Sequence, residues 1–211
     1  MRFLTILTNG YRTIQMYTEF VCDQLAFAHD KEYLNDKKVI EVGSSQWDSK
    51  YNRYMKARLP GFMLAQSTTE MFSRLNAGQY TSYPSDKDIA ENTTADIVCS
   101  FGWMQTRVDP LGAFSTLHDL TNPGGLLILN CPLGITSAMS TMTVNQLIHI
   151  RHANKYECPY LTIANHSIQF KTRLDSKGIF NNRDIKELLY KFRETPNLAV
   201  GVIFKKTSLD S

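Results

Sequence analysis

The chain has 211 residues, of which 43% are hydrophobic and 20% charged, and its formal net charge is +3. This length fits one domain, residues 1–211, that can bury a full core. The composition is that of a globular protein, and no apolar run is long enough to span a membrane. The small positive charge comes without a dense basic run, so nucleic acid is not indicated as a partner.

The cysteines and the N-terminal residues indicate in which cellular compartment the protein is expected. The four cysteines lack paired spacing, which argues against a zinc site and against a disulfide framework. The apolar run at residues 3–7 is too short for a signal peptide core. We therefore expect a cytoplasmic protein with reduced thiols and no metal site.

The first predicted helix covers residues 13–28. Its apolar positions recur at helical spacing and are Ile14, Tyr17, Val21, Leu25 and Ala28. This helix precedes the first predicted strand and is expected to pack on the sheet.

The first strand and its turn lie within residues 37–48. Val39 to Val42 form a short apolar run, interrupted by Glu41, that suits a buried parallel strand. Gly43 follows, where a residue without Cβ allows a tight turn and a close approach of the backbone to a ligand. Ser44, Ser45 and Asp48 favour a helix start. Strand, turn and helix start together indicate the first crossover of an α/β nucleotide-binding fold, with ligand at the carboxyl end of the strand.

Further strands and helices alternate along the chain. The pattern predicts helices at residues 51–59 and 70–76 and strands at residues 62–65 and 96–100, the second followed by Phe101 and Trp103 in a loop. A helix starts at Asp109-Pro110, and the turn Pro123-Gly124-Gly125 leads into an apolar strand from Leu126. This alternation predicts a mainly parallel sheet covered on both faces by helices, with Val39–Val42 at its centre.

Two stretches resemble one family. Apolar-acid-apolar-Gly at residues 40–43, and the order of helix, Pro123-Gly124-Gly125 and strand, are similar to class I S-adenosylmethionine (SAM) methyltransferases. The resemblance spans residues 37–132. It implies a doubly wound, mostly parallel, seven-stranded sheet of Rossmann-like type. It also implies SAM as cofactor, with methyl transfer by in-line displacement as the reaction.

The resemblance also implies a set of cofactor contacts. SAM would lie across Gly43, Ser44 and Ser45, with Glu41 near its amino end and Gln66 near its ribose. In full, the implied cofactor-binding residues are Glu41, Gly43, Ser44, Ser45, Gln66, Ser67, Ser100 and Phe101. Asp86 and Asp88 are candidates for a contact near the adenine.

Three positions depart from the family pattern. Ser45 and Trp47 stand where glycines are usual, and Gln66 stands where the family has an acid that accepts hydrogen bonds from both ribose hydroxyls. Gln66 either retains a weaker ribose contact or is an ordinary polar residue at a strand end. Trp47 either fills the methionine pocket or anchors the following helix in the core.

The C-terminal part leaves the catalytic residues unknown. Residues 133–178 are predicted as an insertion or cap over the substrate, the alternative being a solvated helix. His149, His152 and His166 are possible bases for an oxygen or nitrogen acceptor. Beyond them, a helix through Phe192 and a last strand at residues 197–204, antiparallel at the sheet edge, complete the prediction.

Two functional hypotheses follow. The first is a SAM-dependent methyltransferase whose substrate is a small molecule, a glycan or a macromolecule. The second is a catalytically inactive methyltransferase-like protein that acts as a structural or interaction subunit with a protein partner. No membrane partner is indicated.

Overall fold

The structure is a computed structural model that describes residues 18–43, 49–101, 103–104, 107, 109–133, 143–153, 156–164, 169–171, 174–192 and 198–208. Its first described helix covers residues 18–30. The helices that follow are α2 (Ser49–Arg58), α3 (Thr68–Arg74), the short 3-10 helix η1 (Asp86–Asp88), α4 (Pro110–Leu120), α5 (Val144–Ala153) and α6 (Asn182–Phe192). The strands are β1 (Lys38–Val42), β2 (Gln79–Tyr83), β3 (Ala95–Phe101), β4 (Thr121–Leu133), β5 (Glu157–Ala164), β6 (Gln169–Lys171) and β7 (Leu198–Lys205).

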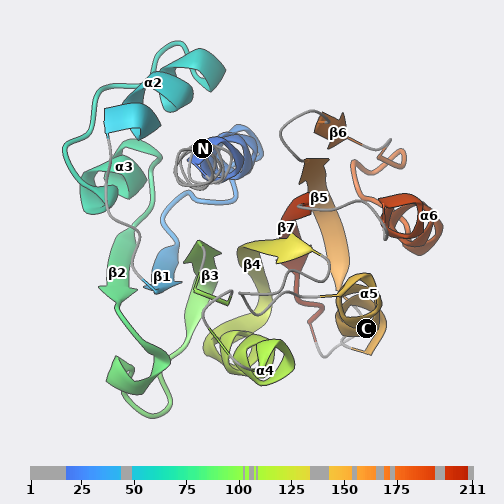
Figure 1. Ribbon diagram of the computed structural model, residues 1–211. Helices are drawn as coiled ribbons and strands as arrows, with labels where there is room; N and C mark the ends of the chain where they lie inside the picture. The colour runs from blue at the N-terminus through green and yellow to red at the C-terminus, as the bar shows by residue number, and fades with distance from the viewer. Residues whose placement is uncertain are drawn as a thin grey trace, which may run out of the picture.

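The described strands form one mixed sheet in the order β2-β1-β3-β4-β7-β5-β6. The pairs β2–β1, β1–β3 and β3–β4 are parallel, whereas β7 runs antiparallel to both β4 and β5. Figure 1 shows helices on both sides of this sheet. The predicted α/β, doubly wound, mostly parallel fold is confirmed. β1 has a neighbour on each side, although the middle strand is β4 rather than β1.

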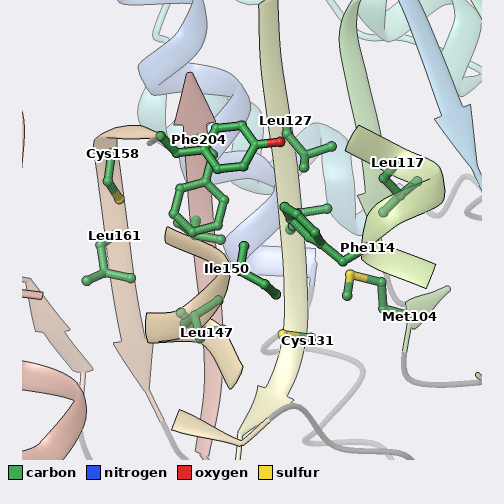
Figure 2. Close-up of a cluster of buried hydrophobic side chains, with 14 of the residues drawn as sticks. Met104, Phe114, Leu117, Leu127, Cys131, Leu147, Ile150, Cys158, Leu161 and Phe204 are labelled. Carbon is green, nitrogen blue, oxygen red and sulfur yellow. The ribbon is translucent and has the colours of Figure 1, made fainter. Parts of the chain in front are cut away.

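Two hydrophobic cores cover the two faces of the sheet. One packs the helix at residues 18–30, α2 and α3 against the strands, with Leu25, Met55 and Phe72 fully buried. The other packs α4, α5 and α6 against the opposite face. Figure 2 shows Phe114 and Leu117 of α4 and Leu147 and Ile150 of α5 gathered over the strands of this second face. Side chains that alternate along each strand supply both cores.

The strand expected at residues 62–65 was wrong, because this segment does not pair with the sheet. Asn52 Nδ2 donates to Ala65 O at 2.8 Å, and Ala65 N donates to Asn52 Oδ1 at 2.9 Å. A side chain of α2 thus satisfies the backbone groups that a neighbouring strand would otherwise satisfy. β2 takes the position beside β1 instead, with Ile40 opposite Thr81.

The elements after residue 96 follow the prediction more closely. β3, α4 and α6 lie where the pattern placed them, and Asp109 caps α4 by accepting a hydrogen bond from Leu111 N at 3.1 Å. β4 begins before the predicted Pro-Gly-Gly turn, which instead interrupts its pairing with β3 between Thr121 and Leu126. Gly124 has a φ of +76°, which a residue without Cβ adopts readily.

The last two predictions concern the C-terminal half. The last strand is antiparallel as expected, but its predicted position at the sheet edge was wrong, because β7 lies between β4 and β5. Within residues 133–178, the described residues form α5, β5 and β6, and β5 belongs to the main sheet. The assignment of this segment as an insertion or cap stays a prediction.

A polar contact joins α4 to the start of β5. The ring of His118 is hydrogen-bonded through Nδ1 to the hydroxyl of Tyr156, which is fully buried and stacks on Phe204 at 5.2 Å between ring centroids. Lys206 Nζ donates to His118 O at 2.9 Å and to Thr121 O at 2.8 Å, so it caps the C-terminus of α4. Burial, and then the charge of Lys206, lower the pKa of His118 below 6.5.

This arrangement predicts the sign of a pH effect on stability. Because the folded state lowers the pKa of His118, the unfolded state binds the proton more readily. The free energy of unfolding should therefore fall as the pH drops through 6.5 and below. Urea denaturation at pH 7.5, 6.5 and 5.5 should show a smaller decline in His118→Gln than in wild type. His149→Gln, at an exposed position on α5, is the control and should keep the wild-type decline.

Candidate functional site

The strand order places the switch point of the sheet, the usual position of a ligand crevice in this class of fold, at the carboxyl ends of β1 and β3. From β1 the chain continues to β2 on one side, and then returns to β3 on the other side. In open α/β sheets a ligand binds where the strand order reverses in this way. Gly43, directly after β1, and the residues after Phe101 of β3 border this point.

Trp103 fills the space directly over Gly43. Gly43 has a φ of +80°, and its N–H donates to Tyr83 O at 2.8 Å, which ties the end of β1 to the end of β2. A Cβ built on Gly43 would lie 2.2 Å from Trp103 Cβ and 2.6 Å from Trp103 Cγ. Trp103 is only 6% exposed and belongs to the core under α4. The close approach that glycine permits here is therefore made by the chain's own indole.

Arg107 connects Trp103 to the end of the neighbouring strand. Its guanidinium carbon lies 5.1 Å from the centre of the Trp103 ring, and its Nη2 lies 3.7 Å from Asp86 Oδ2. Asp86 belongs to η1, which follows β2, and also accepts a hydrogen bond from Ser85 Oγ at 2.9 Å. Because β2 flanks β1, Asp86 is the acid after the strand beside β1. The sequence pattern placed Gln66 where the family has its ribose-binding acid, directly after the strand beside β1. In the structure that strand is β2, so the segment with Asp86 occupies this place.

Glu41 is fully buried on the face covered by α2 and α3. Tyr80 of β2 donates its hydroxyl to Glu41 Oε2 and stacks on Phe72 at 4.6 Å between ring centroids. Burial, and secondly the nearby Glu41, raise the pKa of Tyr80 above its usual value, so the phenol keeps its proton. The carboxyl group predicted to approach the amino end of SAM is thus engaged with the neighbouring strand.

Ser100 and Phe101 end β3 on opposite faces. Ser100 is fully buried, and its hydroxyl has no hydrogen-bond partner among the residues that the structure describes. Because side chains alternate along a strand, Ser100 shares a face with Val98, which packs in the same core as Trp103. Phe101 is half-buried and packs against the opposite core.

Gln66 and Ser67 belong to the start of α3. Gln66 is exposed, and its N–H donates to Glu70 Oε2 at 2.7 Å. Ser67 Oγ accepts from Glu70 N at 3.1 Å, so Ser67 acts as the N-cap of α3. The remaining predicted contacts, Ser44 and Ser45, and also Trp47, lie outside the described residues.

Few other groups in the described residues could do chemistry. Burial raises the pKa of the Cys22, Cys131 and Cys158 thiols to about 12, and it also raises that of Cys99. These thiols stay protonated near neutral pH and are poor nucleophiles. The described part of the chain holds no cluster of three metal-ligating side chains. None of its helices is both long and apolar enough to cross a membrane.

The possible bases lie apart from this crevice or cannot be placed. His149 is exposed on α5, the side chain of His152 is not described, and His166 lies outside the described residues. A surface pocket of about 380 Å³ lies elsewhere, at the C-terminal ends of α2 and α3, and is lined by His29, Leu59, Phe62 and Arg74 among others. It touches none of the predicted cofactor contacts.

Sequence reasoning missed the contact between Gly43 and Trp103. The sequence predicts Trp103 in a loop after the strand at residues 96–100 and gives Asp86 as a candidate contact near the adenine. Nothing in the local pattern joins residues that are 60 positions apart in the chain. Arg107 carried no sequence signal beyond its position in that loop.

Comparison with known proteins identifies the fold. No protein-family model matches the sequence, and no curated protein matches it. Among solved structures, the Burkholderia thailandensis 1,6-didemethyltoxoflavin-N1-methyltransferase, with its substrate and S-adenosylhomocysteine (SAH) bound, matches with a TM-score of 0.50 and 9% identity. The match covers 98% of this chain and 86% of that one. The chain has the fold of a class I methyltransferase.

Two further solved structures have lower scores. A SAM-dependent methyltransferase from Thermotoga maritima, described as a possible histamine N-methyltransferase, has 10% identity and a TM-score of 0.44, covering 95% of this chain and 96% of that one. The [4+2]-cyclase SpnF has 10% identity and a TM-score of 0.49, covering 90% of this chain and 81% of that one. A likeness at such low identity concerns the fold alone, and activity is a separate question.

The residues at the crevice do not fit SAM in the conformation described. The space over Gly43, where the backbone of this fold would approach the cofactor, is occupied by Trp103. A ligand there would overlap the indole unless Trp103 moved. We therefore derive no reaction step through SAM.

Proposed function

We propose that this protein is a SAM-dependent methyltransferase that binds its cofactor at the carboxyl ends of β1 and β3. The observation that carries the proposal is the class I methyltransferase fold, in which Gly43, at a φ of +80°, ends the strand beside the switch point. The proposed contacts are those implied by the sequence: Glu41, Gly43, Ser44, Ser45, Gln66, Ser67, Ser100 and Phe101. The acceptor is a small molecule, a glycan or a macromolecule.

Solved structures support this proposal at the level of the fold. The Burkholderia thailandensis enzyme carries SAH, the product that SAM leaves after methyl transfer. Its name describes transfer to the N1 atom of a small heterocycle. The acceptor of this chain and its catalytic residue are not assigned.

A second candidate function is a catalytically inactive methyltransferase-like subunit that binds a protein partner. The specific observation in its favour is Trp103 over Gly43, together with the engagement of Glu41 by Tyr80. Both make SAM binding harder without disturbing the fold.

Calorimetric titration with SAH separates the two candidates. Wild type should bind SAH, and Gln66→Asp should bind it about tenfold more tightly if residue 66 faces the ribose. A carboxylate offers two acceptors to the two hydroxyls, and a hydrogen bond to a charged group is worth about 1.5–3 kcal/mol. Gln66 is exposed, so the substitution should leave the fold intact.

Gln79→Asp is the matched control, because Gln79 is also exposed but starts β2 at the opposite end of the strand. Its affinity for SAH should equal that of wild type. Absence of binding by wild type, by Gln66→Asp and by a folded Trp103→Gly variant would contradict the methyltransferase proposal and leave the inactive subunit.

A further inference from the structure

The end of β1 is closed by three side chains from two different segments. Trp103 comes from the turn after β3 and lies on Gly43, while Asp86 comes from η1 after β2. Arg107 contacts both, with its guanidinium over the Trp103 ring and its Nη2 near Asp86. The contacts therefore connect the segments that follow the two strands flanking β1.

The Asp86 side of this arrangement is held firmly. Ser85 forms a capping box with η1, in which Ser85 Oγ accepts from Lys87 N at 3.3 Å and Asp88 Oδ2 accepts from Ser85 N at 3.0 Å. Ser85 Oγ also donates to Asp86 Oδ1, which orients the carboxylate. The fixed carboxylate of Asp86 gives Arg107 a stable partner. At the same time the planar guanidinium of Arg107 covers the indole of Trp103.

We propose that Trp103, Arg107 and Asp86 form an autoinhibitory latch that excludes SAM until Trp103 leaves Gly43. The inference rests on the proposed function, since it assigns the occluded space to the cofactor. No ligand atom can share the position over Gly43 with Trp103, because even a single added carbon would lie 2.2 Å from Trp103 Cβ. Binding and release of the indole are therefore coupled.

The contacts that Arg107 makes in the latch are weak enough to break and form again reversibly. The side chains of Arg107 and Asp86 are 37% and 20% exposed, so their ion pair is open to solvent. At exposed sites an ion pair or a cation–π contact shifts an equilibrium by about fivefold or less. The burial of Trp103 itself adds to the closed state. The apparent affinity for SAM is then the intrinsic affinity reduced by the fraction of open molecules.

A second observation points to the same space. Ser100 lies on the Trp103 side of the sheet, with a fully buried hydroxyl that lacks a hydrogen-bond partner within the described part of the chain. A buried polar group without a partner costs free energy. A ligand that reaches this side of the sheet once Trp103 has left would satisfy this hydroxyl.

The first arm of the test measures the latch without any ligand. The chain has two tryptophans, so Trp47→Phe makes Trp103 the sole indole fluorophore. In this background Trp103 should emit at short wavelength and resist quenching by acrylamide. Adding Arg107→Gln or Asp86→Asn should raise the quenching constant and move the emission to longer wavelength. Arg53→Gln is the matched control, because Arg53 lies 5.2 Å over the ring of Tyr54, away from the latch.

The second arm measures SAH affinity by calorimetry. Arg107→Gln should bind SAH more tightly than wild type by about threefold to tenfold, since it removes both the ion pair and the cation–π contact of the closed state. Trp103→Gly, which removes the Cβ as well as the ring, should gain the most. Arg53→Gln should match wild type. Asp86→Asn is kept to the fluorescence arm, because Asp86 follows the strand beside β1, where an acid would itself contact SAH. Arg107→Gln changes a half-buried side chain outside the core, so it keeps the test valid if Trp103→Gly does not fold.

The outcomes separate the latch from the function. If wild type, Arg107→Gln and Trp103→Gly bind SAH with equal affinity, the methyltransferase proposal stands and the latch is overturned. If Trp103 stays protected from acrylamide in both Arg107→Gln and Asp86→Asn, the latch is overturned whatever the affinities. If the indole is released in these variants and no variant binds SAH, the proposed function is overturned, and the latch falls as a gate for SAM.

Discussion

Gly43→Ala should destabilise the protein by about 2–5 kcal/mol. About 1–2 kcal/mol comes from placing a side chain at a φ of +80°. About 1–3 kcal/mol comes from overpacking, because the new Cβ would meet Trp103 Cβ at 2.2 Å. Chemical denaturation, monitored by circular dichroism, measures the change in the free energy of unfolding.

Gly124→Ala separates the two contributions. Gly124 has a similar φ of +76°, yet no atom lies within 4 Å of a Cβ built there. Gly124→Ala should therefore lower the free energy of unfolding only by the contribution of the positive φ, about 1–2 kcal/mol. In a Trp103→Gly background, which removes the Cβ of residue 103 as well as its ring, the cost of Gly43→Ala should also fall to that of Gly124→Ala. Equal costs for the two glycine variants in wild type would show that Trp103 does not press on Gly43.

The contact between Gly43 and Trp103 also affects how the loss of SAM binding in a Gly43 variant can be interpreted. A bulky residue at position 43 would abolish SAM binding if it entered the cleft, but it would also collide with Trp103. Loss of binding in Gly43→Val therefore fails to distinguish a cofactor contact from displaced packing. Substitutions at the exposed Gln66 avoid this ambiguity.

Most of the fold could be predicted because it depends on local patterns. The helical spacing of Ile185, Leu188, Leu189 and Phe192 predicted α6, and all four side chains are buried. Similarly, the apolar run before Gly43 predicted β1. In these segments one face or both faces must be buried, so the periodicity of the sequence determines the element.

The predictions that failed depend on contacts across the chain. The segment at residues 62–65 is as apolar as a strand, but Asn52 satisfies the backbone of Ala65, and Met63 and Leu64 are 60% and 57% exposed. As a result β2 takes the place beside β1. The acid after that strand, Asp86, pairs with Arg107, and local periodicity contains no information about such a pairing.

The tryptophan at the crevice illustrates the same limit. The sequence predicted that a large ring could fill the cofactor pocket, and it named Trp47 because of its position in the glycine motif. The structure places Trp103 over Gly43, while Trp47 lies outside the described residues. The sequence could indicate that a tryptophan obstructs the cofactor site. Which tryptophan does so depends on how the ends of β1 and β3 lie together, and local sequence does not contain this information.

The helix at residues 18–30 is fastened to the sheet by a buried amide pair. Gln24 Nε2 donates to Leu129 O at 2.8 Å and to Val202 O at 2.9 Å, at the seam between β4 and β7. Two carbonyl acceptors fix the orientation of this amide, so Gln24 Oε1 must accept, and it does so from Asn130 Nδ2 at 2.8 Å. Asn130 Oδ1 has no hydrogen-bond partner among the described residues, so within them the side-chain amide of Asn130 is held by its bond to Gln24.

Gln24→Met should therefore cost about 4–6 kcal/mol in the free energy of unfolding. The substitution keeps an unbranched side chain of similar length, which matters because a Cβ on Gly201 would already lie 3.4 Å from Gln24 Cδ. Three hydrogen bonds are lost at about 1 kcal/mol each, and the buried amide of Asn130 adds about 1–3 kcal/mol for lost solvation. Urea denaturation at pH 7.5 gives the value, and Gln79→Met at the exposed start of β2 is the control, expected within about 0.5 kcal/mol of wild type.

The double variant Gln24→Met with Asn130→Leu is the sharper measurement. Removing both polar partners leaves no buried amide without a hydrogen bond, so the double variant should be more stable than Gln24→Met alone by about 1–3 kcal/mol. Asn130→Leu alone should cost less than Gln24→Met, because Gln24 keeps its two carbonyl acceptors. Simple additivity of the two single substitutions would show that the two amides do not depend on each other.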